Sequence, residues 1–266
     1  MSPAPEGGGK EAVTVSVDGD VAIVTLRRPP HNLLTEVALR QVADALHGLP
    51  GRARAAVLAS EGRSFCAGAD FRSGDAPDPT DEGGFETRTG AFYSQAARIY
   101  ESPVPVVAAV QGAAIGAGFG LALACDVRVV GTGAWFQANF VRLGIHPGFA
   151  LSLVLPDVIG PARASELFLT GRRIAADEAG AVGLALPAVP AGEEISAATA
   201  VAAEIAAGAP LAVSSTRATL RQGLGAAVRA AMRHELAEQT ALAGTADAVE
   251  GVNAMLEGRA PRFEGR

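Results

Sequence analysis

The sequence predicts an α/β protein with a helical C-terminal part, and three observations lead to this fold class. Up to Gly160, short runs of β-branched and small apolar residues alternate with helical patterns. From Pro161 onward, helical patterns dominate. The chain has 266 residues, of which 49% are hydrophobic and 19% charged, so it is long enough to bury a substantial core. Strands that alternate with helices are typical of an α/β core.

The first predicted elements are a β-hairpin and a helix. Residues 12–17 and 21–26 are runs rich in β-branched residues, and the Asp-Gly-Asp sequence between them favours a tight turn. Residues 27–30 contain two prolines, which end the second strand. Thr35 is the expected N-cap of the helix that follows. This helix has Glu36 in its first turn, an apolar face of Leu39, Val42 and Leu46, and a stop at Gly48 and Pro50.

The middle of the chain predicts further strands and helices. Residues 72–90 are polar and rich in Gly, Asp and Pro, which is typical of a surface loop. Residues 104–110 are continuously apolar, as in a strand buried on both faces. The remaining expected elements are strands over 55–59 and 126–130, helices over 91–100 and 121–124, and C-terminal helices over 161–170, 175–181, 195–207 and, with breaks, 211–256. We expect a flexible tail at residues 1–10, an α/β core at 11–195 and a helical C-terminal region at 196–266.

Composition and charge exclude several classes of protein. The net charge of −6 argues against general binding of nucleic acid. No apolar run reaches the ~18 residues of a membrane span, and residues 1–10 have no apolar segment of the kind a secretory signal needs. The two cysteines, Cys66 and Cys125, are too few for a disulfide framework. We therefore expect a cytoplasmic protein without a membrane or nucleic-acid partner.

Lysine is nearly absent, because Lys10 is the only one. A phosphate-bearing ligand must therefore be held by arginines or by backbone N–H groups. The glycines of residues 116–120 do not form a dinucleotide-binding fingerprint, because its last glycine would fall at Leu121. The sequence has no P-loop lysine and no G-x-S-x-G elbow of a serine hydrolase. It also has no H-E-x-x-H motif and no paired cysteines, so no metal site is expected.

Two stretches rich in small residues, 63–70 and 111–120, are the strongest functional signal. Each joins an apolar run to a turn where backbone N–H groups can point at a ligand without side chains in the way. Two such N–H groups that converge on one point form an oxyanion hole, which stabilises a carbonyl oxygen that gains negative charge. The alternative is that both stretches are ordinary tight turns that pack a core.

At these residues the chain resembles the enoyl-CoA hydratase/isomerase (crotonase) family, and the resemblance covers nearly the whole chain. The residues that carry it are Leu26-Arg27-Arg28-Pro29 with Asn32, Phe65 to Asp70, Pro105 to Asp126, Phe136, Leu143 to Gly148, Leu169-Thr170-Gly171, Ala181 to Leu184, Glu250-Gly251 and Pro261-Arg262-Phe263. The resemblance implies a crotonase-type spiral of ββα repeats with a helical C-terminal trimerisation region. It also implies a homotrimer or a dimer of trimers, and an acyl-CoA substrate. No separate cofactor is implied, since coenzyme A enters as part of the substrate.

The resemblance assigns the oxyanion-hole N–H groups to Ala69 and Ala117. The N–H of Ala117 lies at or near the start of a helix, where unpaired N–H groups and the helix dipole favour an anion. The implied substrate-binding residues are Arg27, Arg28, Ala67, Asp70, Phe71, Arg72, Gly116, Phe119, Gly120 and Phe140. Arg27, Arg28 and Arg72, with Arg262 as a further candidate, are the expected partners of the coenzyme A phosphates.

The chain departs from the family at the two residues that handle water. Family hydratases place one glutamate three residues after the second hole donor and another about twenty residues later. Here these positions are Gly120 and Phe140, and neither can transfer a proton. Together with Phe119 and Leu121, Phe140 predicts a dry, apolar acyl pocket. Efficient hydratase activity is therefore not expected.

Other polar residues have a functional and a structural interpretation. His146 could act as an acid or base near neutral pH, or its ring could be held by the backbone of a turn. Asp70 lies next to the proposed hole, but a capping role is the alternative. Glu82 and Glu86 are interpreted as solvated charges of the loop, Cys66 as a buried filler, and Asp126 as a local hydrogen-bonding or capping residue.

Three functions remain open from the sequence. The first is an acyl-CoA lyase or isomerase that stabilises an enolate and uses a proton donor other than the usual glutamates. The second is an acyl-CoA decarboxylase or thioester hydrolase of the same fold, which needs only the hole and a shaped pocket. The third is an acyl-CoA-binding protein without catalysis. The acyl group and the reaction are not determined by the sequence.

Overall fold

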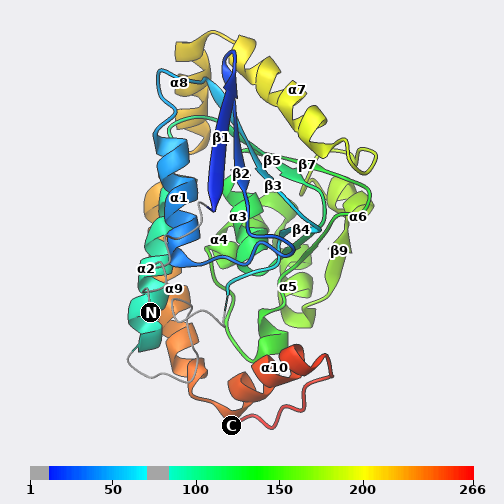
Figure 1. Cartoon of the computed structure of the whole chain (residues 1–266). Coiled ribbons are helices and arrows are strands. Elements are labelled where there is room, and N and C mark those ends of the chain that lie inside the picture. The colour runs from blue at the N-terminus through cyan, green and yellow to red at the C-terminus, as the bar shows by residue number, and fades with distance from the viewer. Residues whose placement is uncertain (1–11, 71–83) are drawn as a thin grey trace, which may run out of the picture.

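A computed structural model describes residues 12–70 and 84–266 (Figure 1). The expected tail at 1–10, and Phe71, Arg72 and Glu82, lie outside the described residues. Within the described ranges the chain forms two sheets with helices packed around them. This confirms the predicted α/β fold.

The larger sheet has five strands in the order β1-β2-β3-β5-β7. Its strands are β1 (Val13–Asp18), β2 (Val21–Leu26), β3 (Ala55–Ser60), β5 (Val106–Val110) and β7 (Val127–Val130). The β1–β2 pair is the antiparallel hairpin that the Asp-Gly-Asp turn predicts, and the other pairs are parallel. Continuous apolar runs such as β5 fit this position, since a parallel strand is covered on both faces.

The smaller sheet has four three-residue strands in the order β4-β6-β8-β9. They are β4 (Ser64–Cys66), β6 (Ala113–Ile115), β8 (Trp135–Gln137) and β9 (Arg173–Ala175). These strands were not predicted from the sequence, because three residues are too few to show a period of two. One strand in each sheet and then a helix recur along the chain: β3-β4 with α2 (Gly84–Tyr100), β5-β6 with α3 (Ala117–Ala124), and β7-β8 with η1 (Phe140–Leu143). This order confirms the spiral of ββα repeats.

Helices cover both faces of the larger sheet. On one face, Val107 and Ala109 of β5 pack with the alanines of α7 (Glu194–Ala207). On the other face, Val106, Ala108 and Val110 belong to the main core, which also contains the apolar side of α1 (Glu36–His47). The hydroxyl of Thr35 accepts the N–H of Ala38 at 3.2 Å, which confirms the predicted N-cap.

One predicted boundary is wrong and has consequences for the site. Helix α2 (Gly84–Tyr100) begins seven residues before the predicted start at 91, so residues 84–90 are helical and not part of a loop. Phe85, Thr89, Phe92 and Tyr93 share one buried face of this helix. Their burial outweighs the low helix propensity of the glycines and threonines around them. Glu86 is therefore an exposed residue in the first turn of a helix.

The remaining helices are α3 (Ala117–Ala124), η1 (Phe140–Leu143), α4 (Leu151–Ile159), α5 (Pro161–Thr170), α6 (Ala176–Ala181), α8 (Pro210–Leu220), α9 (Leu224–Ala243) and α10 (Ala246–Glu257). All of these but η1 and α4 overlap stretches that the sequence predicts as helical. The sequence does not predict α4, since Pro156 interrupts its pattern. Helix α9 packs along α2, and α10 packs on η1 near the C-terminus (Figure 1).

No single helix in the described ranges is long and apolar enough to cross a membrane. The pair α7 and α8 meets the criterion only when taken together, and it is bent by 109° at the break.

Candidate active site

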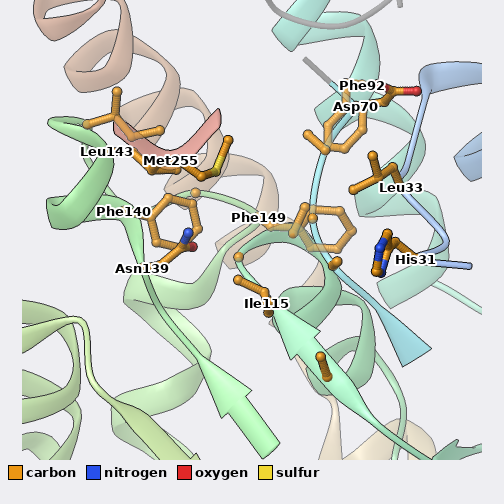
Figure 2. A pocket seen from close by; sticks show the side chains of 18 of the residues that line it. His31, Leu33, Asp70, Phe92, Ile115, Asn139, Phe140, Leu143, Phe149 and Met255 are labelled. Atoms are coloured by element: carbon orange, nitrogen blue, oxygen red, sulfur yellow. The ribbon is translucent and has the colours of Figure 1, made fainter. Parts of the chain in front are cut away.

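A cavity of about 460 Å³ lies between the smaller sheet, α2, α9 and α10. In Figure 2, Phe140, Leu143 and Met255 form one side, and His31, Leu33 and Phe92 lie on the opposite side. The cavity is lined by His31, Leu33, Ser64, Ala67, Gly68, Ala69, Asp70, Phe85, Thr89, Phe92, Tyr93, Ala113, Ile115, Gly116, Ala117, Trp135, Asn139, Phe140, Leu143, Ile145, Gly148, Phe149, Arg173, Gln239, Met255 and Leu256. Most of these side chains are apolar or aromatic.

The first small-residue turn reaches the cavity just after β4. Gly68 has φ +112°, a conformation that favours glycine. The N–H of Ala67 donates to His31 O at 2.9 Å, and that of Asp70 donates to Leu34 O at 2.9 Å. Among the described residues, no acceptor takes the N–H of Ala69 between them. Ala69 lines the cavity, so this donor is free for a ligand.

The second turn brings a helix N-terminus to the same cavity. Ala117 is the first residue of α3, and the first N–H groups of a helix have no acceptor within it. Helix α3 lies directly on β4, because a Cβ on Gly118 would stand 2.0 Å from Cys66 O. Only glycine permits this approach, which places Ala117 beside the turn that contains Ala69. The arrangement suits a carbonyl oxygen that becomes an oxyanion.

Position 120 faces a phenylalanine ring. A Cβ on Gly120 would lie 2.5 Å from Cδ1 of Phe149, which is far too close for a real side chain. Phe149 is 1% exposed and lines the cavity, as does Phe140. Phe149 and Ala150 both have positive φ, at 64° and 57°, which is uncommon for residues other than glycine. The cavity wall next to position 120 is therefore aromatic.

A few polar groups interrupt the apolar wall. Asp70 pairs with Arg28, whose Nη2 lies 3.2 Å from Oδ2. His31 is exposed at the cavity, with Nδ1 3.4 Å from the Ser64 hydroxyl. The Tyr93 hydroxyl donates to Gln239 at 2.9 Å, and burial raises the pKa of this phenol far above its usual range.

The comparisons with known proteins agree with this geometry. Residues 17–266 match the family model described as enoyl-CoA hydratase/isomerase. A probable enoyl-CoA hydratase from Rhodobacter capsulatus is 37% identical over 257 residues, which span 96% of this chain and 98% of that protein. This chain belongs to the enoyl-CoA hydratase/isomerase family.

Other members of the family are similar along their whole length. The 2,3-dehydroadipyl-CoA hydratase of Escherichia coli is 34% identical over 255 residues, with coverage of 95% of this chain and 98% of that protein. A crystal structure of an enoyl-CoA hydratase/isomerase from Pseudoalteromonas atlantica superposes with a TM-score of 0.81 at 30% identity. It covers 95% of this chain and all of the other.

The structure brings together part of the family-implied site. Of the predicted residues that it describes, the cavity is lined by Ala67, Ala69, Asp70, Gly116, Ala117 and Phe140. Phe119 and Gly120 do not line the cavity. The Phe119 ring instead packs on the ring of Phe136, with the two ring centroids 5.1 Å apart. Arg27 pairs with Glu61 at 2.8 Å and lies outside the lining, as does Arg28, which reaches the cavity only through Asp70.

His146 is not placed for chemistry in the cavity. It is absent from the lining, and its Nδ1 lies 2.7 Å from Pro147 O. Its ring meets that of His234 edge-on, with centroids 5.8 Å apart. The structural interpretation of this residue, a ring held in a turn, fits the geometry.

Two other interpretations can be compared with the structure. Cys66 is fully buried, and burial raises the pKa of its thiol to about 12, which fits a filler and not a nucleophile. Asp126 does more than bond locally: it accepts the N–H of Val106 at 2.8 Å and pairs with Arg217 of α8 and with Arg221, the residue directly after this helix. It thus ties α8 to the sheet.

Several residues that line the cavity were not predicted from the sequence. Phe149 follows the family-like residues 143–148 directly, so its bulk beside a glycine-rich turn was a usable signal. His31 precedes Asn32 of another family-like stretch. Tyr93, Gln239 and Arg173 come from distant segments, and no local pattern marks them. Among the described residues, no group of three or more His, Cys, Asp or Glu side chains could hold a metal ion.

Proposed function

We propose that this protein binds an acyl-CoA with a bulky, apolar acyl group and stabilises the enolate of its thioester. The thioester oxygen would lie between the N–H groups of Ala69 and Ala117, which are both on the cavity wall. The observation that carries the proposal is the combination of a free N–H on the first turn with a helix N-terminus on the second. Removal of one such donor typically costs ~2.7–4 kcal/mol of transition-state stabilisation.

The same cavity argues against addition of water. Hydration needs a water molecule that is oriented and deprotonated, for which a hydratase uses carboxylates. Phe149 occupies the space beside Gly120, and Phe140 stands at the second position. The rings of Phe149 and Phe140 offer a water molecule no acceptor at these two positions. The reaction of this protein would therefore be proton transfer or bond cleavage next to the carbonyl, and not hydration.

Among the lining residues that the structure describes, Asp70 and His31 are the candidates for proton transfer. Asp70 directly follows Ala69, which would donate one N–H group of the oxyanion hole, and the Asp70 carboxylate forms an ion pair with Arg28. His31 is exposed at the cavity, and histidine exchanges protons near neutral pH. The thiol of Cys66 and the phenol of Tyr93 hold their protons too tightly at neutral pH. We assign the acid–base role to His31 or Asp70.

The substrate would be recognised at both ends. Aromatic side chains such as Phe85, Phe92 and Trp135 favour a bulky apolar acyl group. The coenzyme A phosphates would meet arginines, with Arg28 as the best placed of the described candidates because its partner Asp70 lines the cavity.

Assembly into a trimer, or a dimer of trimers, is proposed from the family habit and from the C-terminal helices. Helix α8 has no buried residue, and its Leu211 and Leu220 are 86% and 81% exposed. Burial of such leucines stabilises an interface through the hydrophobic effect. Light scattering at micromolar concentration should give the mass of three or six chains, and a monodisperse monomer would contradict this part of the proposal.

Deuterium exchange tests enolate formation directly. Octanoyl-CoA incubated with the protein in D₂O should gain deuterium at its α-carbon, measured by mass spectrometry, and Ala117→Pro should slow this exchange. A panel of enoyl-, β-hydroxy-, malonyl- and aromatic acyl-CoA thioesters then identifies the reaction. Loss of CO₂ or release of free coenzyme A would support a decarboxylase or a thioester hydrolase. Tight binding without exchange or turnover would leave an acyl-CoA-binding protein.

A further inference from the structure

The turn that carries Phe149 is held in an uncommon backbone conformation. Phe149 and Ala150 have φ of 64° and 57°, and neither is a glycine. Such residues persist only where their surroundings hold them, and they gather at functional sites. The turn leads directly into α4, with Ala150 at the N-cap position, yet the methyl group of Ala150 cannot cap the helix.

A carboxylate from another helix supplies the missing cap. Glu235 of α9 is completely buried, and its Oε2 accepts the N–H of Ala150 at 2.7 Å. Its Oε1 accepts the N–H of Ser152 at 3.1 Å and the Ser152 hydroxyl at 2.6 Å. A negative charge at a helix N-terminus also interacts favourably with the helix dipole. Glu235 is 85 residues away from Ala150 in the chain, so this contact connects α9 to the turn.

The conformation of the turn fixes the Phe149 ring. The Tyr100 hydroxyl donates to Phe149 O at 3.2 Å and gives the turn a second contact, this time from α2. The ring meets Phe92 edge-on at 6.0 Å and closes the space beside Gly120. Because backbone φ sets the direction of Cβ, a change at Phe149 and Ala150 would move the ring out of the cavity wall.

We propose that Glu235 is a positioning residue: through Ala150 and Ser152 it holds the Phe149 turn, and it thereby sets the shape of the acyl end of the cavity. The inference rests on the proposed function only in that an acyl group occupies this cavity. Glu235 does not line the cavity and would not touch substrate. Its effect should grow with the size of the acyl group, because a short acyl chain does not reach a displaced Phe149.

The alternative is that Glu235 serves only to fold the chain, and a matched control separates the two. Glu194 is also buried, at 3% exposure, and accepts the N–H of Gly192 with both oxygens, at 3.0 and 3.1 Å. It stands at the start of α7 and does not line the cavity. Glu194→Gln thus changes the same chemistry away from the site.

Intrinsic fluorescence reports binding, because Trp135 is the only tryptophan and lines the cavity. We expect Glu235→Gln to raise the Kd of octanoyl-CoA and phenylacetyl-CoA by about tenfold, and that of acetyl-CoA by less than about twofold. Phe149→Ala should shift the same ligands, and the double variant should add little to either single change. Glu194→Gln should leave the ratio of the affinities unchanged. Equal losses for all acyl groups, or additive effects of Glu235→Gln and Phe149→Ala, would overturn the proposal.

Two further measurements keep the test decisive. If Glu235→Gln does not fold, Ser152→Ala removes one contact of Glu235 and should show the same dependence on acyl size in weaker form; no such dependence overturns the proposal. If the wild type binds no acyl-CoA, the proposed function fails. Hydrogen exchange then tests, without any ligand, whether Glu235 stabilises the Phe149 turn. Compared with the wild type, the Ala150 and Ser152 amides should exchange faster in Glu235→Gln but not in Glu194→Gln. Unchanged exchange would refute the role of Glu235.

Discussion

The ring of Phe149 lies so close to Gly120 that position 120 cannot carry a side chain while the ring stays in place. A Cβ on Gly120 would stand 2.5 Å from Cδ1, and 2.7 Å from both Cβ and Cγ, of Phe149. In family hydratases a glutamate occupies the position of Gly120. The space that a glutamate side chain would need at position 120 is filled by an aromatic ring that comes from the turn before α4.

This contact predicts the effect of a single methyl group. Gly120→Ala should destabilise the fold by ~1–3 kcal/mol, because the added atom overpacks a buried site. Alanine otherwise stabilises a helix relative to glycine by ~0.5–1 kcal/mol. Urea denaturation followed by circular dichroism measures the change. Combination with Phe149→Ala should recover part of the loss.

Gly90 provides the control for this prediction. It also lies in a helix, and a Cβ there would meet only Leu236 Cδ2, at 3.6 Å, an ordinary contact. Gly90→Ala should be neutral or stabilising. If Gly120→Ala behaves like Gly90→Ala, the ring does not occupy the space that we assign to it.

Hydration of crotonyl-CoA should be very slow. Each positioned acid or base typically contributes ~10²–10⁴-fold to the rate, and both positions that carry glutamate in hydratases lack one here. A small residual rate is allowed, since the oxyanion hole remains. Loss of absorbance of the enoyl thioester measures the rate. A kcat typical of an efficient hydratase would show that another residue supplies the base.

Variants that restore the carboxylates extend the same test. Gly120→Glu with Phe140→Glu places one new carboxylate where the Phe149 ring stands, and a buried charge without partners is costly. We expect poor stability and no gain in crotonyl-CoA hydration from this double variant. Addition of Phe149→Ala makes room for the new side chain at position 120, so any recovered hydration should appear first in the triple variant.

The oxyanion hole is tested by the loss of one N–H group. Ala117→Pro removes the donor at the first position of α3, where proline is tolerated in a helix. Deuterium exchange of a bound acyl-CoA should slow by ~10²–10³-fold, while the fold is kept. Ala176→Pro makes the same change at the first residue of α6, outside the cavity lining, and should leave exchange unchanged. Equal exchange in wild type and Ala117→Pro would count against the hole.

The fold could be predicted from the sequence where burial and local pattern agree. Helix α5 begins at Pro161 and ends at Thr170 as predicted, because a proline at the first turn and a glycine after the last one mark both ends. Helix α2 begins earlier than predicted, because Phe85 gains its burial from tertiary packing. The strands of the smaller sheet are too short for any periodicity to reveal them.

The site was predictable where it is made of backbone. The turns at Ala69 and Ala117 are marked by small residues that are adjacent in the chain, and both line the cavity. The cavity wall also includes Phe149, Gln239 and Met255, which come from different segments of the chain and meet only after folding. Contacts between residues that are far apart in the chain leave no local pattern in the sequence. For the same reason, the sequence does not predict the contact between Glu235 and Ala150.

Recognition of phosphate predicts a role for Arg28. Arg28→Gln should raise the Kd of coenzyme A thioesters by about tenfold, as for the loss of a charge-assisted hydrogen bond. Affinity of the wild type should also fall with ionic strength. Arg54→Gln, which breaks only the exposed pair with Asp20 and a long contact to a backbone carbonyl, is the control and should have little effect. Affinity that does not respond to salt or to Arg28→Gln would contradict this role.

The buried carboxyl of Glu235 predicts a dependence of stability on pH. Burial raises its pKa from 4.5 to about 6, although the contacts with Ser152 and Ala150 oppose this shift. His234, next to it on α9, also lowers the pKa, and the phenols of Tyr93 and Tyr100 on α2 face it in neutral form. The folded chain thus holds this proton more tightly than the unfolded chain between pH 4.5 and about 6.

The sign of the effect follows from this difference in proton binding. Where the folded state binds more protons, stability falls as the pH rises, so Glu235 should cost ~2 kcal/mol of unfolding free energy at pH 7.5 relative to pH 4.5. Other carboxyls act in the opposite direction: Arg259 lowers the pKa of Glu250 to about 2, for example. The comparison with Glu235→Gln removes their contribution. The stability of wild type minus that of Glu235→Gln, from urea denaturation, should therefore be larger at pH 4.5 than at pH 7.5, and a difference that stays constant with pH would show that Glu235 titrates as it does in the unfolded chain.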